Sequence, residues 1–407
     1  MNDPNVILVI IMGAILLSGL FSALIKESFL PSVPIFMLIL GIAIGPQVFD
    51  LVNLSSLSNQ YIIIEEVCRI TLAISLMGVA LRIPRSFIPK NWKSLAVILL
   101  AVMPLMFLSS GLLVYLIIGL PFWLAMLIGA CITPTDPVVT SAIVTGKLAE
   151  KNISQRIRSF ISTESGANDG LALPFVLLSI LILSHATRKA LSIWAVDILF
   201  YKIGIGLLFG LIIGFLAGYI LKKAEDRGII EQVNFLSYTL ALSLLTVGAA
   251  ELLSLNSIFA VFIAGLAFDQ IIKGKERAEE EKFQEAINRF FVLPVFILFG
   301  ATIPWEAWFN LGFAGLALCI AILFLRRLPF VLGLKPTMNT LHNFRDSLYV
   351  GWFGPIGVAA IYYLSFSVTE IGSEIFWEIG TLIVFTSILI HGISATPLTR
   401  IYGKNWR

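Results

Sequence analysis

The 407-residue chain is 58% hydrophobic and only 13% charged, with a formal net charge of +3 at pH 7. Because soluble domains carry roughly 25% charged residues, this composition excludes a soluble globular protein, and we expect no soluble regulatory domain. The three cysteines, Cys68, Cys131 and Cys319, all fall in hydrophobic stretches, which argues against a disulfide framework or redox chemistry. We therefore expect a polytopic membrane protein with no nucleic-acid partner and no cofactor.

Apolar runs of about 20 residues, each long enough to cross a hydrocarbon layer of roughly 30 Å, recur from end to end. They predict an all-α fold with about thirteen transmembrane helices. In chain order the predicted spans are Val6–Ile25, Phe29–Ile44, Tyr61–Leu81, Ser94–Ile118, Pro121–Val144, Ile157–Leu183, Ile193–Leu221, Val233–Leu252, Leu255–Phe268, Phe290–Pro304, Leu311–Leu332, Ser347–Val368 and Glu374–Ala395. The first span has full length and no basic n-region, so we interpret it as a spanning helix and not as a cleaved signal peptide.

The spans divide into two units of six, which indicates an inverted repeat within a single transmembrane domain. Residues 1–183 would form the first unit, residues 193–221 a linking helix, and residues 233–396 the second unit. Span five is interrupted at Thr133–Pro137, and its counterpart, span twelve, is interrupted at Gly354–Gly357. Paired Gly/Pro interruptions in corresponding spans are typical of transporters built on crossed, discontinuous helices.

Lysine and arginine concentrate on one side of the predicted membrane. With the N-terminus outside, 22 of the 28 basic residues fall in cytoplasmic loops or in the tail, as the positive-inside rule requires. The longest of these loops, Asp269–Arg289, mixes Lys, Arg and Glu and is expected to be a solvated connector, with a regulatory surface as the alternative. We therefore expect an external N-terminus, a cytoplasmic C-terminus and a location in the plasma membrane.

Two carboxylates stand in the middle of span six, in the run Ser162–Gly170. Glu164 and Asn168 are four residues apart, as are Ser165 and Asp169, so each pair lies on one helix face. A charged side chain at mid-bilayer costs on the order of 3 kcal/mol or more, so such residues face a protein interior or a water-filled cavity. Oxygen donors without sulfur or histidine suit a hard cation. The alternative is that Glu164 or Asp169 is a helix-packing group satisfied by its neighbours.

The interruption in span five supplies further oxygen atoms. Pro134 and Pro137 remove backbone donors, and unwound backbone at membrane depth is tolerated where it lines a cavity. The freed carbonyls and the hydroxyls of Thr133 or Thr135 can coordinate a desolvated cation, and Asp136 adds a negative charge. The alternative is a simple proline kink in which Asp136 caps the lower half-helix.

Two runs carry a family resemblance. The sequences TPTDPVVTSAIV (residues 133–144) and RIRSFISTESGANDGLALPFVLL (residues 156–178) resemble the monovalent cation/proton antiporters of the NhaP and sodium/proton exchanger type. Residues 257–268, 351–364 and 386–398 look like the same family and follow in the expected order. The resemblance therefore covers essentially the whole chain.

The resemblance implies a role for each matching residue. Asp169 would bind either the cation or a proton, and the rest of the cation site would come from Asp136, Ser165, Glu164 and the Thr135 backbone. Asn168 stands where electrogenic relatives have a second Asp, which implies electroneutral, one-for-one exchange. Asn168 would also orient Asp136 or the unwound backbone. The implied cycle is alternating access, in which spans five, six, twelve and thirteen move against a scaffold that includes span seven.

The chain departs from the family where an ion pair would be expected. Many relatives carry a Glu late in span three that pairs with an Arg of span eleven, but Ser75–Pro84 has no acidic residue. Arg326 or Arg327 would supply the arginine, without an identified partner. The earlier Glu65–Glu66 pair is expected to bind Arg69 locally, one helical turn away.

A second departure concerns charge at the crossing. Relatives often have Lys or Arg after the Gly-Pro of span twelve, where this chain has Ile356, so a fixed positive charge is expected to be missing. The glycine stripe Gly206–Gly218, with a glycine every four residues, permits close packing within the protomer or across a homodimer. A homodimer is expected. His391 is expected to be a hydrogen-bonded structural residue, with pH sensing as the alternative.

We predict a secondary transporter that exchanges sodium, or lithium or potassium, for protons and serves pH and sodium homeostasis. A potassium-selective antiporter is the main rival, because oxygen ligands do not distinguish these cations. A cation channel would need a continuous pore, against which the single carboxylate site argues. We expect no enzyme, because the three histidines, His185, His342 and His391, form no catalytic pair or metal cluster and no nucleophile elbow is present.

Overall fold

The structure of the chain is a computed structural model. It describes residues 9–16, 33–54, 57, 59–136, 139, 143–228, 235–272 and 290–404. Most of the predicted first span, the start of the second, Pro137, the first two residues of span eight and nearly all of the predicted loop Asp269–Arg289 lie outside these residues. Within the described residues all regular structure is helical, which confirms the predicted all-α class.

The helices follow the predicted spans, with some spans made of two or three pieces. Residues 9–16 are helical. The others are α3 (Val33–Ile44), α4 (Gln60–Arg82), α5 (Phe87–Val97), a π-helical turn (Ile98–Val102), α6 (Met103–Ile118), α7 (Phe122–Cys131), α8 (Gly146–Asn152), α9 (Gln155–Leu171), α10 (Leu173–Ser184), α11 (Thr187–Ile193), a π-helical stretch (Trp194–Ile205), α12 (Gly206–Asp226), α13 (Phe235–Leu252), α14 (Ser257–Ile271), Phe290–Ala301, α16 (Trp305–Leu325), α17 (Leu328–Gly333), a 3-10 turn (Lys335–Thr337), α18 (Phe344–Trp352), α19 (Val358–Ile371) and α20 (Ile375–Lys404).

By length and composition, six of the described helices can cross a membrane, and five shorter apolar helices of 10–17 residues accompany them. The short ones include α7 and α19, which are the pieces of spans five and twelve that flank the predicted interruptions. A half-length helix satisfies its own backbone but leaves a polar end inside the protein. The unwound segments between the pieces therefore need partners from other helices.

The end of span thirteen was predicted too early. α20 continues past Ala395 to Lys404, because its last two turns still bury side chains against α18. Thr399 Oγ1 lies 2.8 Å from Tyr349 Oη, and the Tyr402 hydroxyl donates to the Asp346 carboxylate at 2.6 Å. Asp346 also accepts a hydrogen bond from Arg156 on α9 at 2.8 Å, so the ends of α9, α18 and α20 are joined there.

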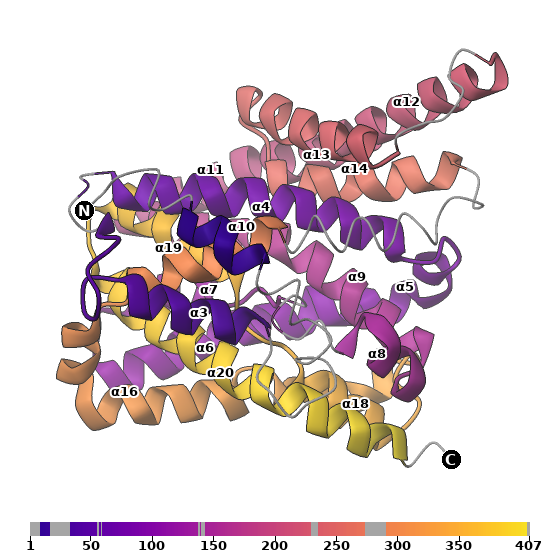
Figure 1. Cartoon of the computed structure of the whole chain (residues 1–407). Helices are drawn as coiled ribbons and strands as arrows, with labels where there is room; N and C mark the ends of the chain where they lie inside the picture. Colours follow the sequence, from indigo (N-terminus) through magenta and orange to yellow (C-terminus); the bar gives the residue numbers. More distant parts are fainter. Residues whose placement is uncertain are drawn as a thin grey trace.

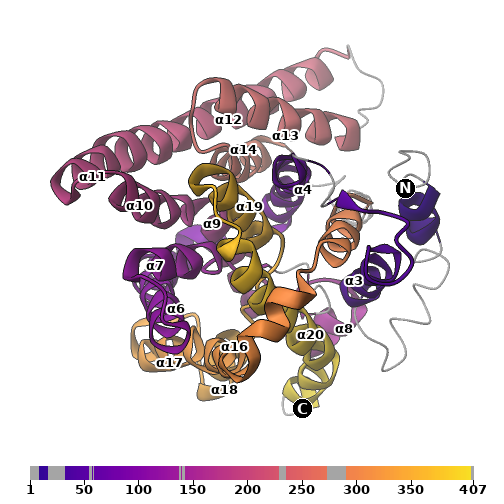
Figure 2. The ribbon, with the colours of Figure 1, turned by 90° about the vertical axis from the view of Figure 1, so that its left-hand side faces the viewer.

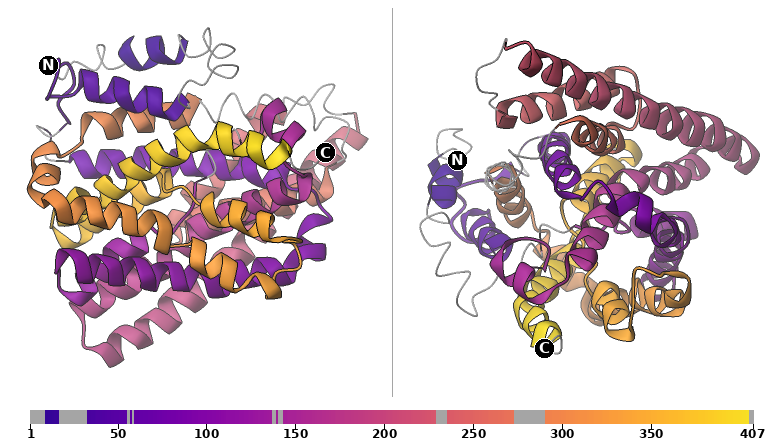
Figure 3. Two further views of the ribbon diagram at one scale, coloured as in Figure 1. Left: turned by 90° about the horizontal axis from the view of Figure 1, so that it is seen from below. Right: turned by 90° about the vertical axis from the view of Figure 1, so that its right-hand side faces the viewer.

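The helices form a layer and a bundle. α12, α13 and α14 lie along the top in Figure 1, with α4 packed against α14. Viewed from the side, α4, α9 and α19 lie between this layer and the group α6, α7, α16 and α18 (Figure 2). α12 and α13 again occupy the outer edge in the opposite side view (Figure 3, right). The predicted scaffold helix, α12, thus lies on the outside, and α9, which carries the Ser162–Gly170 run, lies inside.

The glycine stripe of α12 packs within the protomer. A Cβ atom on Gly210 would collide with the Ala260 carbonyl, and one on Gly214 with the Ala264 carbonyl, both on α14. Close approach of α12 and α14 therefore needs glycine at these positions. Of the two alternatives left open by the sequence, the structure shows packing inside one chain.

Candidate functional site: two crossed interruptions and a buried aspartate

The two predicted interruptions meet at the centre of the molecule. α7 ends at Cys131 and α18 at Trp352, and α19 begins at Val358. The Asp136 amide donates to the Pro355 carbonyl at 2.8 Å, so one unwound segment binds the other directly. A Cβ atom on Gly357 would overlap the Asp136 carboxyl group, which explains why glycine stands at this position.

Asp136 sits at the N-terminus of α19. Its Oδ2 accepts a hydrogen bond from the Val358 amide at 2.8 Å, and its side chain is 4% exposed. The free amides at a helix N-terminus favour a negative charge there. Asp136 therefore does cap a half-helix, and that helix is α19; most of the residues of its own span that follow Asp136 lie outside the described residues.

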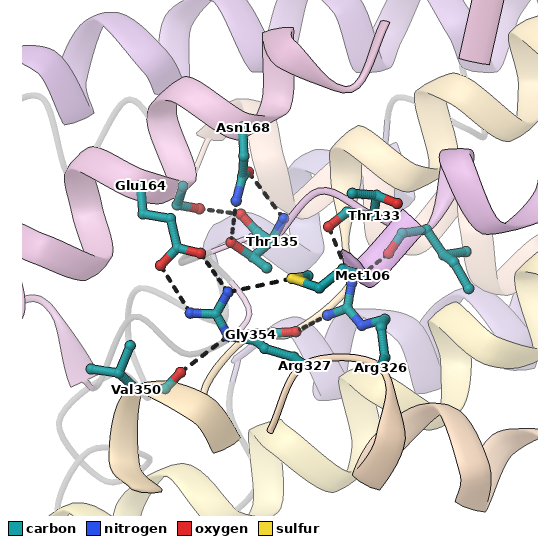
Figure 4. Close-up of polar contacts among 11 residues, drawn as sticks. Met106, Thr133, Thr135, Glu164, Asn168, Arg326, Arg327, Val350 and Gly354 are labelled. Carbon is teal, nitrogen blue, oxygen red and sulfur yellow. Dashed lines mark hydrogen bonds and ion pairs between the residues drawn. The ribbon is translucent and has the colours of Figure 1, made fainter. Parts of the chain in front are cut away.

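Arg326 supplies a positive charge at the crossing. Its guanidinium donates to the carbonyls of Ile132 and Thr133, just past the end of α7, and to the carbonyl of Gly354, just past the end of α18 (Figure 4). Helix C-termini carry partial negative charge and favour a cation. The charge expected to be missing because of Ile356 is thus provided from α16, while Ile356 itself is buried and its amide donates to Ser387 Oγ at 2.8 Å.

Arg327 forms a buried ion pair with Glu164. Its two terminal nitrogens donate to the two Glu164 carboxylate oxygens, the longer bond measuring 2.8 Å (Figure 4). Arg327 Nε donates to the Val350 carbonyl at 3.1 Å. The unidentified partner of the span-eleven arginine is therefore Glu164. Glu164, expected among the cation ligands, is placed on Arg327 instead, as in the alternative of a carboxylate satisfied by its neighbours.

Asn168 and Ser165 hold the unwound backbone of span five. The Asn168 Oδ1 accepts from the Thr135 amide at 3.1 Å, and its Nδ2 donates to Thr135 Oγ1 at 2.8 Å. The Ser165 hydroxyl donates to the Thr135 carbonyl. Thr133 Oγ1 instead donates back to the Gly129 carbonyl of its own helix at 2.7 Å. The predicted contact between Asn168 and the unwound backbone is present.

Asp169 differs from the residues around it. It is 4% exposed, and within the described part of the chain its Oδ1 is buried without a hydrogen-bond partner. Its main-chain carbonyl accepts from the Tyr363 hydroxyl at 2.6 Å. Buried polar atoms are hydrogen-bonded in the great majority of cases, so an orphaned carboxylate oxygen at this depth marks a place for a proton or a cation.

Asp169 and Asp136 line the same small cavity. Its walls also include Thr71 and Ser75 of α4 and Gly166 of α9. The cavity has a volume of about 10 Å³, counted as the space that the centre of a water molecule can occupy. It has room for roughly one water molecule. Two carboxylates and two hydroxyls around such a space form an oxygen-rich site for one small ion.

Some residues of the site were missed from the sequence. Thr71 and Ser75 are polar residues four apart in the otherwise apolar stretch 70–81 of α4, and this spacing places them on one face. That signal could have found them. The local ion pair predicted for Glu65–Glu66 and Arg69 is present between Glu66 and Arg69. Arg69 also pairs with Glu251 of α13 at 3.3 Å.

The matching family model and two of the similar proteins all concern sodium/proton exchange. The model of the transmembrane sodium/hydrogen exchanger family matches residues 7–401. The chain is 32% identical to a Na(+)/H(+) antiporter of Schizosaccharomyces pombe, over 99% of this chain and 92% of that protein. It is 30% identical to Na(+)/H(+) antiporter 2 of Zygosaccharomyces rouxii over 93% of this chain, but it spans only 51% of that protein's length.

A solved structure agrees with the fold. The sodium proton antiporter MjNhaP1 from Methanocaldococcus jannaschii at pH 8 superposes with a TM-score of 0.73 and 21% identity. The alignment covers 95% of this chain and 98% of that one. At this level of identity the match supports the helical architecture.

Proposed function

Because this chain belongs to the transmembrane sodium/hydrogen exchanger family, we propose that it exchanges a monovalent cation for a proton, with the Asp169 carboxylate binding either ion. One observation carries the proposal: Asp169 Oδ1 is buried beside a small cavity and has no hydrogen-bond partner among the described residues. A proton on this oxygen or a cation beside it would satisfy it, and a protonated carboxyl group no longer carries the charge that holds a cation. This competition couples the two ions.

The cation ligands in this proposal are oxygen atoms around the cavity. Asp169 and Asp136 contribute carboxylates, Thr71 and Ser75 contribute hydroxyls, and the Thr135 carbonyl is held nearby by Ser165. Hard monovalent cations favour such ligands. Glu164 stays on Arg327 and acts indirectly, by fixing the helix that carries Asp169.

The charges buried at the crossing and around the cavity support one-for-one exchange. Asp136, Glu164, Asp169, Arg326 and Arg327 are all 3–4% exposed, and with all five ionised their formal charge is minus one. One monovalent cation or one proton on Asp169 brings this charge to zero. The loaded site then crosses the low-dielectric barrier more cheaply than the empty one, which favours exchange over leak and makes each half-cycle electrically neutral.

The moving part in this proposal is the bundle that contains α7, α9, α18, α19 and α20. These helices share the crossing and its hydrogen bonds, while α4, α12, α13 and α14 form the opposing layer. The cavity lies where α4 faces α9 and α19. Displacement of the bundle against α4 would expose Asp169 to one side and then to the other. A plasma-membrane location, an external N-terminus and a homodimer remain part of the proposal.

The ion and the stoichiometry are tested in proteoliposomes. Proton flux is measured with an internal pH dye while sodium, lithium or potassium is supplied in turn over a range of pH; we expect saturable flux with sodium. Flux with potassium alone would identify the rival potassium-selective exchanger, and currents far above carrier turnover would identify a channel.

Electroneutrality is tested on the same vesicles adsorbed to a solid-supported membrane. We expect a sodium concentration jump to drive proton flux without a sustained current, because the loaded site carries no net charge. One uncompensated charge per cycle would couple transport to the membrane potential by about 2.3 kcal/mol per 100 mV. A sodium-dependent current with the amplitude of the dye-reported flux would refute the one-for-one scheme.

A further inference from the structure

The break between α18 and α19 leaves two backbone groups apart that a continuous helix would join. In an α-helix the amide of one residue bonds to the carbonyl four residues earlier. The Trp352 carbonyl and the Ile356 amide stand in this relation, but the chain unwinds between them. The Ile356 amide lies inside the protein, where an unpaired backbone group is costly. The Trp352 carbonyl accepts one bond from the Gly354 amide at 2.9 Å and can accept a second.

Two side chains of α20 bind these two groups. The Ile356 amide donates to Ser387 Oγ at 2.8 Å, and His391 Nε2 lies 3.0 Å from the Trp352 carbonyl. Ser387 Oγ and His391 Nδ1 are 3.1 Å apart. Ser387 is 1% exposed and His391 4% exposed, and their spacing of four places them on one face of α20.

One arrangement of protons gives each group in this series of hydrogen bonds a partner. The Ile356 N–H donates to Ser387, the Ser387 hydroxyl donates to Nδ1 of a neutral imidazole, and the Nε2–H donates to the Trp352 carbonyl. The Ser387 carbonyl oxygen also lies 2.9 Å from Nδ1. A proton on Nδ1 alone would be donated to it and would turn the Nε2 lone pair toward the Trp352 oxygen, whereas a proton on Nε2 leaves the Nδ1 lone pair beside both that carbonyl and the Ser387 hydroxyl, which can donate to it. An imidazolium would add a third positive charge near Arg326 and Arg327.

We propose that Ser387 and His391 form a side-chain strap that replaces the helical hydrogen bond lost at the break and so positions the segment Phe353–Gly357. This segment presents the Pro355 carbonyl to the Asp136 amide, and it sets the start of α19, where the Val358 amide binds the Asp136 carboxylate. The strap therefore acts on the cavity through Asp136 and touches no transported ion. The strap is a positioning device. Only its effect on transport rests on the proposed function.

The first test needs no transport. Hydrogen–deuterium exchange of the whole 407-residue chain in detergent is followed on peptides that cover Phe353–Gly357 and, separately, α9. We expect Ser387→Ala to raise exchange in the first peptide about tenfold and to leave α9 unchanged, since only the Ile356 amide loses its acceptor. Ser365→Ala is the matched control, because among the described residues that buried hydroxyl bonds only the Ile361 carbonyl of its own helix. Unchanged exchange in Ser387→Ala overturns the strap.

The second test reads the KM for the cation in proteoliposomes. We expect Ser387→Ala and His391→Leu each to raise KM about tenfold with kcat within about twofold, as the loss of one buried hydrogen bond implies. The double variant is expected to match the singles, because one unit is already broken. His391→Gln keeps a donor for the Trp352 carbonyl and is expected to restore KM to within about threefold of the native value, with an unchanged pH profile.

Other outcomes of the second test count against the proposal. Independent, multiplicative effects of the two single variants would show that Ser387 and His391 do not act as one unit. A native KM with a displaced pH profile in His391→Gln would make His391 a pH sensor. If the native protein shows no cation flux, the proposed function fails, and the exchange measurement still decides the strap.

Discussion

Glu164 and Asp169 are carboxylates on the same helix, five positions apart, and are 3% and 4% exposed. Both oxygens of Glu164 are held by Arg327, whereas Asp169 Oδ1 has no partner among the described residues. Burial alone therefore does not separate the two residues. The two residues differ in whether a fixed countercharge is present. A paired carboxylate is already neutralised, whereas an unpaired buried carboxylate is stabilised by taking up an ion.

The comparison extends to the groups around each carboxylate. Glu164 faces a guanidinium that also donates to the Val350 carbonyl, so both members of the pair have fixed partners. Asp169 faces a cavity that it shares with Asp136, and two like charges around one space favour the entry of a cation or a proton. The first arrangement stabilises the bundle, and the second is suited to exchange.

The largest expected effect is that of Asp169→Asn. The amide cannot release a proton or balance a cation, so we expect cation-dependent proton flux to fall to the level of empty vesicles. The fold is expected to persist, because a neutral group replaces an unpaired buried charge. Flux is measured with the pH dye, and folding by thermal unfolding and size-exclusion chromatography. Asp197→Asn, at an exposed position near α11, is the matched control, and native flux in Asp169→Asn contradicts the proposal.

The next effect concerns stability. Glu164→Gln leaves the Arg327 guanidinium buried without a countercharge, and breaking a buried ion pair in this way costs about 3–5 kcal/mol. Arg327→Met exposes Glu164 to the same penalty. We expect both single variants to unfold at clearly lower temperature in detergent than Asp169→Asn.

The double variant sharpens this prediction. Glu164→Gln combined with Arg327→Met removes both charges and is expected to be more stable than either single variant, since no unpaired ion remains. Additive loss in the double variant would mean that Glu164 and Arg327 stabilise the protein independently, and the contrast with Asp169 would then lose its basis.

The sequence was sufficient to predict the all-α class, the two interruptions and the polar run of α9 that meets them. Breaks at Thr133–Pro137 and Gly354–Gly357 follow from local Gly/Pro chemistry, and the polar run of α9 stands out against an apolar background. Asn168 was correctly expected to bind the unwound backbone, where it holds Thr135. These features are local, so a pattern within one span reveals them.

The pairing of charges was not predictable in the same way. Glu164 and Arg327 are 163 residues apart, and Arg326 reaches carbonyls at the ends of two other helices. Which arginine meets which partner depends on the rotation and crossing of α9 and α16. α16 is apolar on nearly all faces and carries little amphipathic signal to fix its rotation. The same reason hid the capping of α19 by Asp136 from the sequence.

The smallest expected effects concern Asn168, the neighbour of Asp169. Asn168→Ala removes two hydrogen bonds to Thr135, each worth roughly 0.5–1.5 kcal/mol, so we expect a KM for the cation about tenfold above native and no change in electroneutrality.

Asn168→Asp keeps an acceptor for the Thr135 amide, and the Thr135 hydroxyl can turn to donate to it. The substitution adds a second carboxylate beside Asp169, so one bound cation no longer cancels the buried charge. We therefore expect slow flux accompanied by a sodium-dependent current on the solid-supported membrane. An Asn168→Asp variant that transports at the native rate without a sodium-dependent current would show that the charge at this position does not set the stoichiometry.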